Sequence, residues 1–219
     1  MAEPQSTKIR AAWRDCWADR RLRPHVVLTP LALVAAVRLL AVFLVRIESR
    51  PGVRLQDPLL DALAPRDCSW LIFAMIYLAI ALVVAVLAGH PRELVIASQA
   101  YVLMLLSRMC AMYFTALDPP ADAIPLVDPL VERLGTGRLL TRDLFFSGHT
   151  ATLFLLFLSV PVRTFKALVL AATVVVAGCV LVQHVHYTID VLVAPMFAFA
   201  SHRAARLAHG GQAASSPPR

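Results

Sequence analysis

Charged residues are scarce in this sequence, and their scarcity argues against a soluble fold. Only 16% of the 219 residues are Asp, Glu, Lys or Arg, and these gather in clusters between long apolar runs. Hydrophobic residues make up 59% of the chain, whereas a soluble domain has about 45–50%. Together with a mean hydropathy of +0.70, this composition predicts an integral membrane protein.

Cysteine pairs and glycine-rich loops are missing as well. The four cysteines, Cys16, Cys68, Cys110 and Cys179, show no C-x-x-C or other paired spacing, so the sequence predicts no disulfide framework. There is no glycine-rich phosphate loop and no internal repeat. Nucleotide-binding loops and repeat architectures therefore have no support in this chain.

The N-terminal segment lacks the pattern of a secretory signal peptide, because no apolar core follows its basic residues quickly. Six Lys and Arg residues lie there, with Trp13 and Trp17 between them. A basic segment can bind nucleic acid, but beside a membrane span it more often meets anionic lipid. We predict that residues 1–25 form a basic cytoplasmic juxtamembrane segment, with an interfacial helix as one form of it, and that the chain binds no nucleic acid.

Long apolar runs are what the sequence has in abundance, and six of them approach the roughly 20 residues that cross a bilayer. They are about Val26 to Ile47, Trp70 to Gly89, Glu93 to Leu117, Thr150 to Val162, Ala167 to His184 and Tyr187 to Arg203. The fourth is short, ends at Pro161 and has the alternative of beginning at Leu144. The predicted fold is all-α, a six-transmembrane-helix bundle over residues 26–204, followed by a flexible cytoplasmic tail at 205–219.

The orientation of these runs is predicted from the distribution of Lys and Arg, which favour the cytoplasmic side. With the N-terminus inside, the inner segments hold twelve basic residues and the longer outer loops hold seven. The twelve are Lys8, Arg10, Arg14, Arg20, Arg21, Arg23, Arg92, Arg163, Lys166, Arg203, Arg206 and Arg219. We predict a multi-pass protein with both termini cytoplasmic and its polar motifs opening on the other face.

Two polar motifs interrupt the apolar runs, and ionisable residues at such places mark a functional site by default because burying them is costly. The first motif is Asp143-Leu-Phe-Phe-Ser-Gly-His-Thr, and the second is His184-Val-His-Tyr-Thr-Ile-Asp-Val. In the second, His186 and Asp190 are four residues apart. On a helix they would share a face, and a carboxylate on one ring nitrogen raises the basicity of the other. Capping of a helix start is the alternative for this pair.

The first motif places His149 directly after Ser147-Gly148 at the start of an apolar run. Taken alone, this histidine is better explained by a helix start that Ser147 or Thr150 caps. Two histidines at the starts of neighbouring helices, one of them with an Asp partner, favour catalysis instead.

These motifs resemble the sphingomyelin synthase branch of the lipid phosphate phosphatase (PAP2) superfamily. That branch carries D-x3-S-G-H-T and H-Y-T-x-D-V-x-x-A, and Asp143 and Ala194 supply the first position of the former and the last position of the latter. The resemblance implies a six-span bundle and catalytic roles for His149, His186 and Asp190. It also implies a metal-independent enzyme without cofactor, and covers about residues 58–195.

An arginine in the outer half of the third apolar run is the candidate for holding the substrate phosphate. Arg108 begins the stretch Arg-Met-Cys-Ala-Met-Tyr113-Phe-Thr-Ala-Leu, which resembles a segment of the same family. A guanidinium offers a planar fork of donors to phosphate oxygens and stays charged where lysine would not. Snorkelling to the interface and pairing with Asp143 are the alternatives. The other substrate-binding candidates are Tyr113, Asp143, Ser147 and Tyr187.

Two features separate the chain from parts of the family it resembles. The soluble-type lipid phosphatases carry K-x6-R-P before the S-G-H motif, but no basic residue of 118–146, including Arg133 and Arg138, has that spacing. This absence favours the synthase branch. It also makes Arg108 more important as the residue that would bind the phosphate. The departure from the synthases is Thr141-Arg142, which stands where they usually have Cys-Gly.

The predicted reaction moves a phosphocholine- or phosphoethanolamine-type head group from a phospholipid donor to a lipid alcohol such as ceramide or diacylglycerol. His186 is the nucleophile and His149 the acid, and a phosphohistidine is the intermediate. The alternatives are a lipid phosphatase that uses water and a six-span transporter with a histidine proton path. A metal site at His149, His184, His186 and Asp190 is disfavoured, because His184 and His186 would diverge on a helix.

Overall fold

Eight helices make up the regular structure in this computed structural model, which describes residues 5–126 and 140–210. They are α1 (Gln5–Ala18), α2 (Leu22–Glu48), α3 (Pro58–Asp61), α4 (Ser69–Leu87), α5 (Pro91–Phe114), α7 (Gly148–Ser159), α8 (Arg163–Val182) and α9 (Thr188–Gly210). The described residues thus confirm the all-helical prediction. Arg133, Arg138 and the last nine residues of the predicted tail lie outside them.

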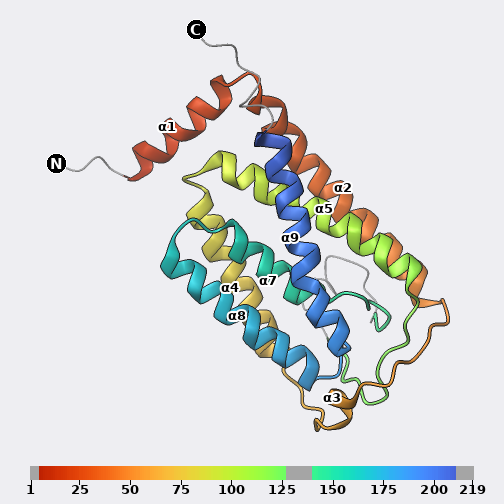
Figure 1. The fold of residues 1–219 in the computed structure, drawn as a ribbon. Coiled ribbons are helices and arrows are strands. Elements are labelled where there is room, and N and C mark those ends of the chain that lie inside the picture. Colours follow the sequence, from red (N-terminus) through yellow and green to blue (C-terminus); the bar gives the residue numbers. More distant parts are fainter. Residues whose placement is uncertain (1–4, 127–139, 211–219) are drawn as a thin grey trace.

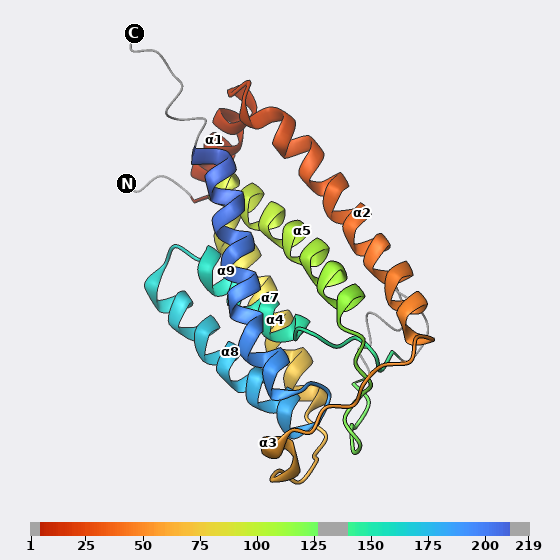
Figure 2. The same cartoon turned by 45° about the vertical axis from the view of Figure 1, so that its right-hand side comes forward.

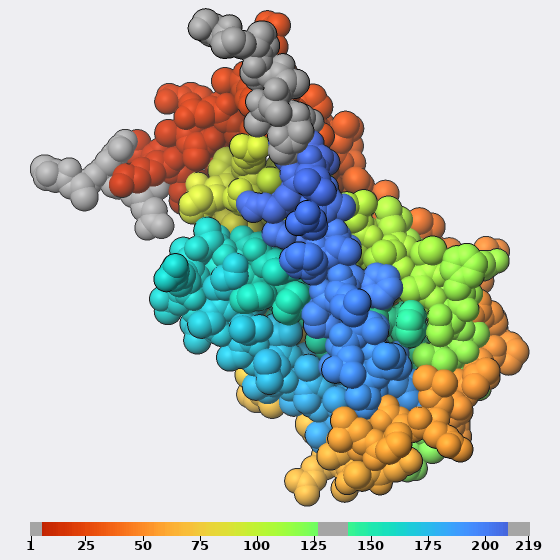
Figure 3. Space-filling model, viewed as in Figure 1, coloured from red at the N-terminus to blue at the C-terminus, as the bar shows by residue number. Residues whose placement is uncertain are grey.

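The helices form a bundle in which α9 is central. It packs against α5 on one side and α7 on the other, α2 covers α5, and α4 and α8 pack against α7 (Figures 1 and 2). Figure 3 shows α9 running along the face between α8 and α5. Small residues line the central contacts: Ala100 of α5, Ala151 of α7 and Ala194 and Ala198 of α9 belong to one buried cluster. Small side chains let helix backbones approach closely, which is the packing that membrane helices favour.

Four helices, α2, α4, α5 and α8, are long and apolar enough to cross a membrane. The other two predicted spans also fall on helices, but α7 has only 12 residues, a length of about 18 Å against a hydrocarbon core of about 30 Å. The 23 residues of α9 end in a polar stretch that includes Arg203 and Arg206. A multi-pass membrane protein is therefore indicated, whereas the six-span count is not confirmed.

The start of α7 corrects one expectation about the fourth apolar run. The helix begins at Gly148, where Ser147 is its N-cap, and residues 140–147 before it are not helical. The possible extension back to Leu144 was therefore wrong. At its other end α7 stops at Ser159, because Pro161 holds the residue before it in an extended conformation.

Both chain ends lie at one end of the bundle, and the long loops lie at the other (Figures 1 and 2). At the first end α1 lies across the helices, and the Trp13 indole donates a hydrogen bond to the Ala88 carbonyl at 2.9 Å. Helix α9 continues to Gly210, into the segment expected to be a flexible tail. We call the end with the chain termini the terminal end and the end with the long loops the loop end.

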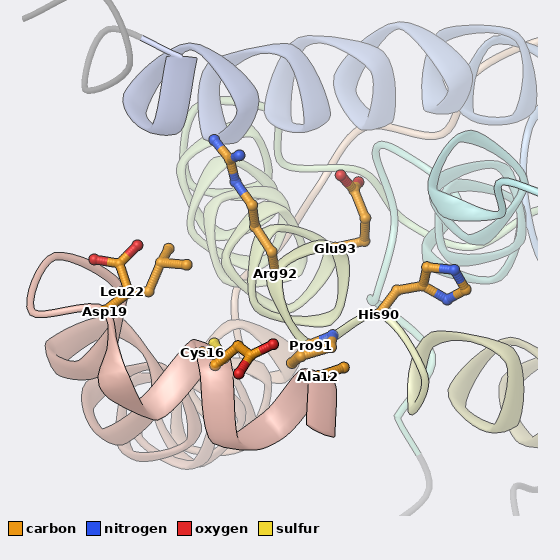
Figure 4. Close-up of a pocket in the computed structure, with 9 residues that line it drawn as sticks. Ala12, Cys16, Asp19, Leu22, His90, Pro91, Arg92 and Glu93 are labelled. Carbon is orange, nitrogen blue, oxygen red and sulfur yellow. The ribbon is translucent and has the colours of Figure 1, made fainter. Parts of the chain in front are cut away.

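A cavity of about 350 Å³ opens at the terminal end, between α1 and the first turn of α5. Figure 4 shows Cys16 of α1 and Asp19, which follows α1, on one side of it and Arg92 and Glu93 on the other. Glu93 is already paired with Arg206 of α9 at 3.0 Å. This cavity contains neither of the two polar motifs, which are built from the other end.

Candidate active site

The second motif forms the start of α9 and buries a histidine–aspartate pair. His186 lies two residues before the helix, and its Nδ1 is 3.3 Å from Asp190 Oδ2, with both side chains almost fully buried. Asp190 Oδ2 also accepts the Tyr187 N–H at 3.2 Å, which is the return contact of a helix capping box. Capping and pairing therefore occur together, and one carboxylate fixes both the helix start and the imidazole.

The first motif forms the start of α7 and is tied to the second through the backbone. The Ser147 N–H donates to the Asp190 carbonyl at 3.0 Å, while Ser147 Oγ accepts from the Thr150 N–H and hydroxyl at 3.4 and 3.1 Å. This bond brings the His149 and His186 rings to a centroid distance of 6.4 Å. The two histidines are thus close enough to contact one phosphoryl group between them.

The His149 ring is oriented by an aromatic neighbour that the sequence did not reveal. Phe73 of α4 is 6% exposed and meets the ring edge to face, at 6.0 Å between centroids and 70° between planes. Phe73 lies in a uniformly apolar run, so nothing in its local sequence distinguishes it from other packing residues.

Arg108 reaches the same site from α5 and is 6% exposed. Its Nη2 lies 2.9 Å from Asp143 Oδ1 and 3.3 Å from the Asp143 carbonyl oxygen. The pairing with Asp143 that was one alternative is therefore present. Its Nε, however, has no hydrogen-bond partner among the described residues. A buried donor without a partner costs about 1–3 kcal/mol, and a bound anion would satisfy it.

Gly148 is what allows the guanidinium to sit at the start of α7. A Cβ built on Gly148 would collide with Nη1 of Arg108 and lie 2.6 Å from its Cζ. Glycine at this position of the S-G-H sequence is therefore required by the close approach of Arg108. The sequence motif and the distant arginine are two parts of one packing arrangement.

The non-helical segment 140–147 enters the bundle and brings Asp143 to Arg108. Phe146 is fully buried and stacks on Phe197 of α9 at 4.3 Å between centroids and 12° between planes. At the loop end the segment is held by Glu48, whose carboxylate accepts the backbone N–H of Thr141 and of Arg142 at 3.0 Å. Arg142 in turn pairs with Asp118 at 2.8 Å. Thr141 and Arg142, the two residues that depart from the synthase pattern, thus attach this segment to Glu48 and Asp118.

Asp57 supports the start of α9 from a loop 131 residues away. Its two carboxylate oxygens accept the Thr188 N–H at 2.7 Å and the Thr188 hydroxyl at 2.9 Å. The same carboxylate caps α3 by accepting from Leu59 and Leu60. Burial raises the pKa of Asp57, but these hydrogen bonds outweigh it and hold the pKa below its ordinary value of 3.8. The Asp-Pro start of α3 is a local capping signal, whereas the bond to Thr188 has none.

The two tyrosine candidates take different places. The Tyr187 side chain is buried at the loop end, where its hydroxyl donates to the Asp118 carbonyl at 2.8 Å and accepts the Leu55 N–H at 3.2 Å. Tyr113 is 61% exposed at the end of α5 and lies beside Phe114 and the guanidinium of Arg50. Of the proposed substrate-binding residues, only Arg108, Asp143 and Ser147 thus meet around the histidines.

His184 lies in the turn between α8 and α9 with a positive φ of 56°. Its side chain is buried, and Nε2 has no hydrogen-bond partner among the described residues. Within the described part of the chain no group of three or more His, Cys, Asp or Glu side chains is placed to hold a metal ion.

Replacing Asp57 by Ala is expected to destabilise the start of α9. The variant loses the caps of two helices, and one N-cap substitution alone costs about 0.5–2 kcal/mol. We expect a lower melting temperature together with lower turnover, because His186 directly precedes the helix start that Asp57 holds. The control is Asp61→Ala, since Asp61 is exposed at the end of α3 and should leave both unchanged.

The same contacts give a pH dependence. Because the pKa of Asp57 is lowered on folding, its stabilisation is complete above the ordinary pKa and is lost as the pH falls through the lowered one. The parent melting temperature should therefore converge with that of Asp57→Ala as the pH falls below 3.8 and through the lowered pKa. An unchanged gap between them at low pH would contradict this role for the carboxylate.

Comparison with known proteins agrees with this arrangement. Residues 142–206 match the family described as PAP2 superfamily C-terminal, and the matched segment contains His149, His186 and Asp190. No curated protein sequence matches the chain closely enough to give a relative. The family match supports the PAP2 superfamily for this chain and indicates a lipid enzyme of the phosphatase or phosphotransferase type.

Proposed function

We propose that the protein is a membrane phosphotransferase that moves a phospholipid head group to a lipid alcohol, as the sphingomyelin synthases do. The observation that carries the proposal is the 6.4 Å distance between the centroids of the His149 and His186 rings. Asp190 pairs with His186, and the guanidinium of Arg108 reaches from α5 to the start of α7, the helix that carries His149. A nucleophile, an acid and a phosphate ligand are the groups that two-step phosphoryl transfer needs.

In the first step His186 attacks the phosphorus of the donor through Nε2, because Nδ1 faces Asp190. A bond forms between that nitrogen and phosphorus while the bond from phosphorus to the diacylglycerol oxygen breaks. His149 gives its proton to the departing oxygen. Asp190 stabilises the positive charge that develops on the His186 ring, and Arg108 offers its Nε–H to a phosphate oxygen.

In the second step the head group remains on His186 and an acceptor hydroxyl enters. His149 is now neutral and takes the hydroxyl proton, while the acceptor oxygen bonds to phosphorus and the bond to His186 breaks. Microscopic reversibility makes His149 the acid of one half-reaction and the base of the other. Phosphocholine or phosphoethanolamine as head group and ceramide or diacylglycerol as acceptor are parts of this proposal.

A lipid phosphatase that uses water as acceptor is the alternative, because the family indicated by residues 142–206 is of phosphatase or phosphotransferase type. Both activities form a phosphohistidine by displacing a lipid alkoxide, but a phosphatase leaves a bare phosphoryl group on the histidine and then uses water. The missing K-x6-R-P element of 118–146 and the burial of His186 and Asp190 favour a lipid acceptor over water.

The reaction is tested with the purified protein in vesicles that contain a head-group-labelled donor. Lipid mass spectrometry should find labelled head group on added ceramide or diacylglycerol, with little release to water. If added alcohol leaves hydrolysis undiminished and gains no label, water is the acceptor and the protein is a hydrolase. If neither product forms with any of these lipids, the transferase proposal fails.

We also propose that the loop end faces away from the cytoplasm, because it holds fewer Lys and Arg residues despite its longer loops. In a variant without native cysteines, a cysteine at Ala62, which is exposed beside α3, should react with an impermeant thiol reagent in intact cells. One at Thr164, exposed in the first turn of α8, should react only after lysis. The reverse pattern would place the histidines toward the cytoplasm.

A further inference from the structure

Two cysteines that are 111 positions apart in the sequence meet at the loop end of the bundle. Cys68 is the N-cap of α4, and Cys179 lies in the last turn of α8. Helices α4 and α8 are neighbours, and both cysteines belong to the apolar cluster between them. The remaining two cysteines, Cys16 of α1 and Cys110 of α5, lie on other helices.

Gln183 fixes the positions of both residues. Its backbone N–H donates to the Cys179 carbonyl at 2.9 Å, and its side-chain oxygen accepts the Cys68 N–H at 2.9 Å. Its side-chain nitrogen donates to Ser69 Oγ at 2.8 Å and to the Ile124 carbonyl at 3.2 Å. Gln183 is fully buried, so the start of α4 and the end of α8 are held together by bonds shielded from water.

Cys68 packs against the buried cluster that contains Cys179, and the two thiols lie close enough to interact. Cys68 is partly exposed, whereas Cys179 is 9% exposed. One sulfur is therefore accessible to an oxidant, and the second lies beside it in a protected position. This is the arrangement of an attacking thiol with a resolving partner.

We propose that Cys68 and Cys179 form a disulfide that joins α4 to α8. A small-molecule disulfide such as oxidised glutathione is the oxidant. The Cys68 thiolate attacks it, one glutathione thiol leaves, and the Cys179 thiolate then displaces the second. One S–S bond forms in the protein, one is reduced in the oxidant, and the two cysteine protons end on the two glutathione thiols. Formation brings the sulfurs from contact to about 2.05 Å.

The bond would stabilise the segment that carries the second motif. Cys179 is one turn before Gln183, and His184 and His186 follow in the next three residues. A covalent link at this point holds the end of α8 to α4, and α4 also contributes Phe73 to His149. The inference does not depend on the proposed reaction, because it concerns two thiols outside the histidine site. The disulfide would form in an oxidising compartment, because the proposed orientation places the loop end away from the cytoplasm.

Thiol counting by mass spectrometry tests the proposal. After incubation of the folded protein with oxidised glutathione, denaturation and alkylation should modify Cys16 and Cys110 but neither Cys68 nor Cys179. Reduction before alkylation should expose all four. Peptide mapping should recover a Cys68–Cys179 linked peptide, and Cys110→Ser should leave it unchanged.

Heating supplies a second measurement that does not depend on peptide recovery. The oxidised parent protein should melt at a higher temperature than the reduced one, whereas Cys68→Ser and Cys179→Ser should each show no difference between the two conditions. Four alkylated cysteines after oxidation, or a linked peptide that contains Cys110 or Cys16 instead, would overturn the proposal.

Discussion

His186→Ala should abolish turnover of every donor, whereas His149→Ala should recover much of its activity when the leaving group needs no proton. Loss of a nucleophile removes the covalent step itself and is expected to cost about 10⁴-fold or more. Loss of a general acid costs about 10²–10⁴-fold with a lipid alkoxide. Nitrophenolate departs as a stable anion, so a nitrophenyl phosphodiester should show little of the second loss.

The measurement compares each variant with the natural donor and with the nitrophenyl substrate. Asp190→Asn should fall between the two histidine variants, because it keeps a hydrogen-bond partner for His186 but can hold the wrong tautomer. Rapid-quench labelling should trap an acid-labile adduct on the parent and on no His186 variant. Equal labelling of His186→Ala would exclude a phosphohistidine there and leave direct transfer as the simpler mechanism.

The positions of the helices were largely predictable because apolar runs of membrane length are a local property of the sequence. Every predicted run falls on a helix. Local sequence could not predict how deep in the bundle each helix begins, and α7 shows why. Its 12 residues begin inside the bundle, because segment 140–147 is bonded to Glu48 at the loop end and packs against Phe197 of α9.

The pairing within each motif was predictable for the same reason. His186 and Asp190 are separated by one helical turn, and Ser147 stands at a cap position. The supports of the site come instead from distant segments. Asp57 bonds Thr188 across 131 residues, and Phe73 of α4 faces His149. No spacing rule links such residues, because the contact is made by the packing of helices that are not adjacent in sequence.

Arg108 falls between these two cases. Its type and its place inside an apolar run marked it as functional, but its contacts with Gly148 and Asp143 were not predictable from spacing. Those contacts decide how it can bind phosphate. Asp143 occupies Nη2, Gly148 admits the guanidinium close to α7, and Nε has no partner within the part of the chain that the structure describes.

Gly148→Ala should therefore inactivate the enzyme through Arg108. The added methyl group cannot coexist with the guanidinium in its present position, so Arg108 must move, and a displacement of about 1 Å in a positioning group can cost about 100-fold in rate. Arg108→Lys should lose a similar factor, because it keeps the charge but not the planar fork. The double variant should be little worse than either single one, since both remove the same contact.

Two matched controls separate this effect from damage to the fold. Gly178→Ala adds a methyl group to α8 where nothing lies within 4 Å, so it should leave activity unchanged and raise stability by up to about 1 kcal/mol. Arg38→Lys alters an exposed arginine of α2 and should have no effect. Activity is measured beside thermal unfolding for all five variants. Parent-like turnover in Gly148→Ala or in Arg108→Lys would assign the arginine to structure, and additive losses in the double variant would separate it from Gly148.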